Sequence, residues 1–146
     1  NKLYIYNMVK FGGEECMTKA GVINFQKKPN CEILIIKFTA TWCGPCRTIK
    51  DDCLKLVNQM GDNVTFVEID VDEYMELYGA LKQKKQVNGI PAFLAFSSKR
   101  YNESEWFIPN DSHTGADKQA MLNFFIRCDK YAKNGLANDH LNSIKN

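Results

Sequence analysis

Two cysteines separated by two residues are the part of this sequence best suited to chemistry. Cys43 and Cys46 enclose Gly44 and Pro45, shortly after the apolar run at residues 33–36. Thiols at this spacing can close a small, reversible disulfide. A thiol at the start of a helix is also acidified, because unpaired backbone N–H groups and the helix dipole favour the thiolate. The pattern therefore predicts a redox-active pair.

The pair is expected at the junction between a buried strand over residues 33–38 and a helix over residues 45–60. Proline is acceptable in the first helical turn, since that N–H has no helical partner. Cys46 shares a helical stripe with Cys53 and other apolar residues, whereas Cys43 lies at the helix tip. We therefore expect Cys43 to face solvent as the attacking thiol, and Cys46 to lie beneath it as the resolving thiol.

The rest of the chain must supply the elements that hold this pair in place. Periodicity and turn signals predict strands at residues 3–9, 33–38, 64–71, 93–96 and 106–108, and helices at residues 14–25, 45–60, 74–81 and 118–133. The resulting order, β-α-β-α-β-α-β-β-α, predicts an α/β fold in which a central mixed β-sheet is flanked by helices on both faces.

Composition limits the classes of function. The 146 residues, 45% hydrophobic and 25% charged, suit one domain over residues 1–133 and a tail over residues 134–146. A net charge of +2 argues against nucleic acid, and no apolar stretch reaches the roughly 18–20 residues that span a bilayer. No signal peptide is visible, which favours the cytoplasm. Because the chain opens with Asn1, an organellar or secretory leader stays an open alternative.

Three segments resemble the thioredoxin family. They are Ala-Thr-Trp-Cys-Gly-Pro-Cys at residues 40–46, Ile-Pro-Ala-Phe at residues 90–93, and Thr-Gly-Ala-Asp-Lys at residues 114–118. The resemblance covers about residues 31–133. It implies the thioredoxin fold and the activity of a protein disulfide reductase.

The resemblance also implies roles for individual residues. Cys43 would attack a substrate disulfide as a thiolate, and Cys46 would resolve the mixed disulfide that forms. Pro91, in the cis form, would hold a loop beside Cys43. The backbone at Ile90 and Pro91 would pair with an extended substrate segment. Trp42 would add flat apolar contact surface next to the nucleophile.

Gly44 and Pro45 between the cysteines mark the reducing members of the family, which favours a reductase over a disulfide-forming enzyme. The cysteine pair carries the electrons, so no bound cofactor is expected. The implied partners are disulfide-containing protein substrates, with a thioredoxin reductase or glutathione as the electron source. Nothing in the sequence demands an oligomer, and a monomer is expected.

Lys37 departs from the family pattern. It stands six residues before Cys43, where the family usually carries a buried acid. An unpaired buried ammonium is costly, so Lys37 needs a partner. The resemblance implies Glu68 of the following strand, at the position that faces the acid in the family, and we expect the two to form an ion pair. The cation would favour thiolates, but it could act as a base only if it were neutral. The helix-kinking proline of the family is replaced by Asp51, which predicts a straighter helix.

The four remaining cysteines divide into two groups. Cys53 and Cys128 fall on the apolar stripes of predicted helices and are expected in the core. Cys16 and Cys31 stay open between a structural role and an exposed position subject to oxidation or dimerisation.

Three other roles of the cysteine pair are alternatives to protein disulfide reduction. A structural zinc site normally needs four ligands, and His113 and His140 lie far apart in polar stretches, so no metal is expected. A binding module with weak redox turnover stays open because of Lys37. A secretory disulfide isomerase or oxidase is disfavoured by the Gly-Pro pair. Compared with the family, residues 72–90 hold about one additional helical turn, and residues 97–114 run several residues longer. These additions are tolerated insertions or partner-specific surfaces.

Overall fold

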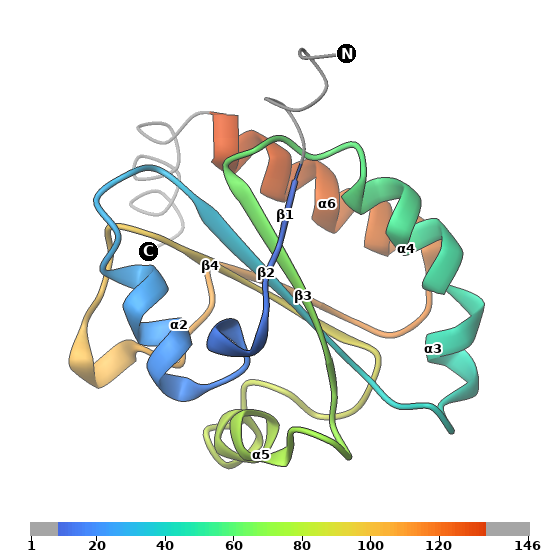
Figure 1. Cartoon of the computed structure of the whole chain (residues 1–146). Coiled ribbons are helices and arrows are strands. Elements are labelled where there is room, and N and C mark those ends of the chain that lie inside the picture. Colours follow the sequence, from blue (N-terminus) through green and yellow to red (C-terminus); the bar gives the residue numbers. More distant parts are fainter. Residues whose placement is uncertain (1–8, 134–146) are drawn as a thin grey trace.

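The computed structural model describes residues 9–133, and a five-stranded mixed sheet forms its centre (Figure 1). The strands are β1 (Lys10–Phe11), β2 (Ile33–Thr39), β3 (Val64–Asp70), β4 (Ala92–Ser97) and β5 (Asp111–Thr114). The helical segments are η1 (Glu14–Cys16), α2 (Lys19–Gln26), α3 (Gly44–Thr48), α4 (Lys50–Val57), α5 (Met75–Gln83), η2 (Glu103–Glu105) and α6 (Lys118–Lys133). None of these helices is long and apolar enough to cross a membrane.

The strand order is β1-β3-β2-β4-β5, with β2 parallel to β3 and antiparallel to β4. Figure 1 shows α2 and α5 on one side of the sheet and α4 and α6 on the other. Alternate residues of β2 pack into two hydrophobic cores, one on each face of the sheet. Ile33 and Ile35 pack with α4 and α6, while Leu34 and Ile36 pack with α2 and α5. A strand covered on both faces reads as a continuous apolar run. The predicted fold class is confirmed.

The segment after the cysteine pair differs from the single straight helix that we expected. It is divided at Ile49 into α3 and α4, and α4 ends at Val57. The Thr48 hydroxyl donates to the Pro45 carbonyl at 2.8 Å, a back-bond that bends helices, and the Ile49 side chain is fully buried. The Ile49 carbonyl then accepts from the Cys53 amide to begin α4. The bend therefore needs no proline.

Two further expectations need correction. The predicted strand at residues 106–108 is absent: Trp106 is a buried residue after η2, and sheet pairing resumes only at β5. Asn110 shifts the start of that pairing toward the C-terminus. Its side-chain oxygen accepts from the Ser97 backbone amide, and its backbone amide donates to the Ala95 carbonyl. The predicted helix at residues 14–25 is divided into η1 and α2.

Gly21 explains how closely η1 and α2 can pack. A Cβ atom at this position would lie 1.7 Å from the Glu15 carbonyl oxygen, so only glycine fits. Thr18 begins α2, and its hydroxyl accepts from the Gly21 amide at 3.0 Å. Most of the strand predicted at residues 3–9, the tail at residues 134–146 and His140 lie outside the described residues.

Candidate active site

Cys43 and Cys46 form a disulfide at the start of α3, with their Cα atoms 5.3 Å apart. Cys43 is the N-cap of this helix, and the Cys46 amide donates to Cys43 Sγ at 3.2 Å. Gly44 and Pro45 form the first turn, where the missing N–H of proline costs nothing. A helix amide aimed at the sulfur stabilises a thiolate there once the disulfide is reduced.

The two sulfurs are less different in exposure than the sequence suggested. Cys43 is 4% exposed and Cys46 2%, so the expectation that Cys43 faces solvent does not hold in this oxidised form. Cys43 packs with Ala40 and Cys46 in a small apolar cluster, and Val71 and Ile90 pack against that cluster. The apolar cover of the disulfide therefore comes in part from segments that are remote from it in sequence.

The Ile90 loop, which precedes β4, places Ile90 and Pro91 directly beside the disulfide. The peptide bond between them is cis, and the Ile90 carbonyl oxygen lies 3.9 Å from Cys43 Sγ. Gly89 precedes them with φ of 131°, a conformation that favours glycine. The Gly115 amide holds the other side of the loop by donating to the Pro91 carbonyl at 2.9 Å.

Trp42 presents a fixed, largely exposed indole next to Cys43. Its side chain is 65% exposed, and Nε1 donates to Asp72 Oδ2 at 2.7 Å. The Asp72 amide in turn donates to Asp70 Oδ1 at 2.8 Å, which shapes the turn after β3. Sequence reasoning missed Asp72. The only available signal was a pair of aspartates just after a strand, a pattern that predicts a turn but not its partner.

The ion pair predicted between Lys37 and Glu68 is present. The two residues are register partners on β2 and β3, and Lys37 Nζ lies 2.9 Å from Glu68 Oε2. The lysine side chain is 1% exposed, whereas that of Glu68 is 34% exposed. Burial raises the pKa of the nearby Cys53 thiol to about 11; the Lys37 ammonium opposes this shift and the Glu68 carboxylate adds to it. The pair therefore joins a buried cation to an acid within reach of water.

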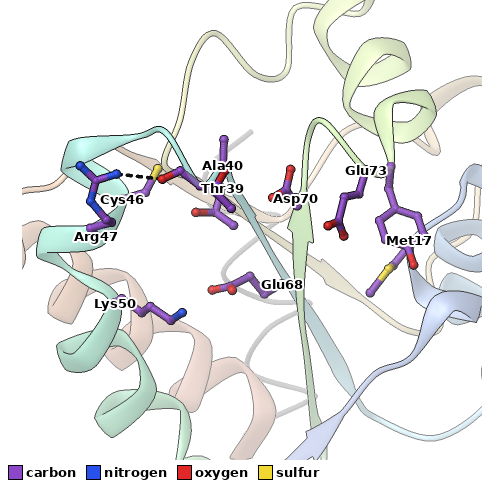
Figure 2. Close-up of a pocket in the computed structure, with 11 residues that line it drawn as sticks. Met17, Thr39, Ala40, Cys46, Arg47, Lys50, Glu68, Asp70 and Glu73 are labelled. Atoms are coloured by element: carbon purple, nitrogen blue, oxygen red, sulfur yellow. Dashed lines mark hydrogen bonds between the residues drawn. The ribbon is translucent and has the colours of Figure 1, made fainter.

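A cavity of about 520 Å³ connects this pair with the disulfide (Figure 2). It is lined by Cys46 and Arg47 from α3, Lys50 from α4, and Glu68 and Asp70 from β3. Figure 2 shows the Glu68 carboxylate pointing from β3 toward the side of the cavity formed by α3 and α4. The second cysteine of the pair therefore shares a water-accessible space with several charged side chains.

The Thioredoxin family model matches residues 18–126. The chain belongs to the thioredoxin family. It is 36% identical over 97 residues to thioredoxin from Bacillus subtilis, which covers 66% of this chain and 89% of the bacterial protein. It is 32% identical over 93 residues to the chloroplastic thioredoxin X of Arabidopsis thaliana, covering 64% of this chain.

The chain spans less than half the length of the plant relatives it matches: 46% of thioredoxin X and 41% of the rice thioredoxin-like protein CITRX. Among solved structures it is similar to thioredoxin from Malassezia sympodialis, with a TM-score of 0.58. That match covers 84% of this chain and 92% of the fungal one. Because the sequence identity is 22%, the match supports the fold alone.

The remaining cysteines of this thioredoxin-family chain follow the expected division in part. Cys53 and Cys128 are buried, and burial raises the pKa of the Cys128 thiol well above its usual value. Cys16 is half-buried and Cys31 is exposed. Within residues 9–133, no three or more His, Cys, Asp or Glu side chains are grouped to hold a metal ion.

Proposed function

We propose that the protein reduces disulfide bonds in other proteins, using Cys43 and Cys46 as a reversible dithiol. The observation that carries the proposal is the disulfide between them at the start of α3, beside the Ile90 loop. In the reduced protein the Cys46 amide, now 3.2 Å from Cys43 Sγ, favours the thiolate that must attack.

The reaction has two exchanges. The Cys43 thiolate attacks one substrate sulfur, the other substrate sulfur leaves and takes a proton from water, and Cys43 is joined to the substrate. Cys46 then loses its proton and attacks Cys43 Sγ. The Cys43–Cys46 disulfide forms, and the second substrate sulfur leaves as a thiolate. Two electrons pass from the pair to the substrate, so the reaction needs no bound cofactor.

Substrate contact is assigned to Trp42, Ile90 and Pro91. The exposed indole offers an apolar surface, and its hydrogen bond to Asp72 keeps it in one orientation. An extended substrate segment can pair with the backbone of the Ile90–Pro91 loop, which would align its disulfide with Cys43. Gly44 and Pro45 support the pair by forming the first turn of α3.

The electrons are proposed to come from a thioredoxin reductase or from glutathione. A reducing compartment suits the four cysteines that remain free in the described residues. We place the protein in the cytoplasm first; the chloroplastic names of the plant relatives make an organelle the alternative. We further propose that residues 1–133 form a single domain and that it acts as a monomer.

Reduction of insulin by dithiothreitol tests this function. The protein should accelerate the precipitation of the insulin B chain, and Cys43→Ser should abolish the acceleration. Cys31→Ser is the matched control, since it removes an exposed cysteine distant from the site in sequence. Precipitation no faster than with dithiothreitol alone would overturn the proposal and favour a binding module that uses the Trp42 surface without turnover.

A further inference from the structure

Cys46 must lose a proton before its sulfur can attack Cys43, and that proton needs an acceptor. Cys46 is 2% exposed, and the cavity shown in Figure 2 is the space it shares with charged groups. The titratable and charged groups around this cavity are Arg47 of α3, Lys50 of α4, Glu68 and Asp70 of β3, and Glu73 and Tyr74 of the segment before α5. Lys37 and Cys53 lie close to Glu68 in the interior.

The cations and the phenol cannot accept the proton. Arg47 and Lys50 are exposed basic side chains, and a guanidinium or ammonium group offers only hydrogen-bond donors. Lys37 is ion-paired with Glu68, and a charged ammonium has no free electron pair. The Tyr74 hydroxyl donates to Glu14, and this hydrogen bond raises the pKa of the phenol, so Tyr74 keeps its proton. An acceptor must therefore be a carboxylate.

Of the three carboxylates that line the cavity, Glu68 is the best placed. Asp70 Oδ1 accepts from the Asp72 amide at 2.8 Å and belongs to the turn that follows β3. Glu73 is exposed, and within residues 9–133 its carboxylate makes no hydrogen bond or ion pair that would hold it toward the cysteine. Glu68 is held through Oε2 by the buried Lys37, and its Oε1 makes no hydrogen bond within residues 9–133.

We infer that Glu68 accepts the proton of Cys46 through water in this cavity, and that Lys37 positions the carboxylate for this step. The inference rests on the proposed function and assigns its second exchange. As the proton leaves Cys46, its sulfur bonds to Cys43 Sγ and the substrate sulfur departs as a thiolate. Glu68 then returns the proton to solvent, which its 34% exposed side chain can reach.

The reaction of the reduced protein with the small disulfide 5,5′-dithiobis(2-nitrobenzoate), followed by stopped flow, separates the two exchanges. Attack by Cys43 releases one thionitrobenzoate at a rate that depends on reagent concentration. Attack by Cys46 releases a second at a rate that does not. Cys16→Ser and Cys31→Ser in the background remove the more accessible other thiols, and Cys46→Ser identifies the second phase by abolishing it.

The central comparison is the unsubstituted pair against Lys37→Met/Glu68→Gln, because neither protein leaves a buried ammonium unpaired. Lys37→Met alone keeps the carboxylate but removes the ammonium that holds it, so the rate of its second phase should lie between the two. Loss of the carboxylate should slow the second phase at least tenfold at pH 7 and change the first phase less than twofold. The difference should shrink as the pH rises, since hydroxide can then remove the thiol proton without the carboxylate. Glu68→Gln in the Lys37 background is the second measurement, and circular dichroism checks the fold of each variant.

Glu73→Gln is the matched control, because it removes the same charge from the same cavity. A negative charge that acts only through space hinders ionisation of Cys46, so its removal should speed the second phase. Faster or unchanged second phases in the Glu68→Gln variants would overturn the inference, as would a loss that is equal at every pH. Failure of the proposed function would look different: the unsubstituted protein would show no second phase or would not reduce insulin.

Discussion

The two side chains of the Lys37–Glu68 pair should contribute very unequally to stability, although they share one ion pair. Replacing Glu68 by Met leaves the Lys37 ammonium, 1% exposed, without its carboxylate. Replacing Lys37 by Met leaves a carboxylate that is 34% exposed and lines a water-accessible cavity. Only the first change strands a charge in the interior.

The magnitudes follow from what each variant leaves behind. Breaking a buried ion pair from one side costs about 3–5 kcal/mol, and entry of water through the cavity places Glu68→Met near 3 kcal/mol. For a chain of this length that is a Tm lowered by roughly 10 °C. Lys37→Met should change the free energy of unfolding by less than about 1 kcal/mol. The double variant should lie near the unsubstituted protein, because matched apolar replacement of a buried pair is often neutral.

Urea unfolding followed by circular dichroism measures these free energies under constant oxidising conditions. Lys118→Met serves as a reference, since it breaks an exposed ion pair with Asp52 and should cost less than about 1 kcal/mol. Equal losses in Lys37→Met and Glu68→Met would refute the reasoning from burial. A double variant as unstable as Glu68→Met would show that lost packing, and not a stranded charge, sets the cost.

Two further predictions concern the indole and the buried thiols. Asp72→Ala should free the Trp42 ring and slow insulin reduction about 3–10-fold, the net worth of one ordinary hydrogen bond, with the rate of Cys43 toward a small disulfide unchanged. Because burial raises the pKa of Cys53 to about 11 and the pKa of Cys128 well above its usual value, both thiols should resist iodoacetamide at pH 8, as mass spectrometry would report. The folded state disfavours these thiolates, so the free energy of unfolding should fall as pH rises above about 8.5. Labelling of either thiol at pH 8 without denaturant would contradict their burial.

Local sequence signals predicted an element near the site well where burial of its apolar side chains alone determined the structure. The apolar run of β2 and the helical stripe of α6 each have a single low-energy solution, and both appear with nearly the expected bounds. The break at Ile49 and the position of β5 were missed. Each depends on a side chain, Thr48 or Asn110, that bonds to backbone groups in place of the regular pattern.

The sequence by itself determined the redox pair through a two-residue spacing and the family through local motifs. The cost of a buried charge required a partner for Lys37, and the family resemblance pointed to Glu68. Tertiary structure alone decided that Asp72 holds Trp42, that Ile90 packs against the cluster around Cys43, and that Cys46 and Glu68 line one cavity. These contacts join segments remote in sequence. Their geometry depends on how helices and loops pack on the sheet, which no local pattern specifies.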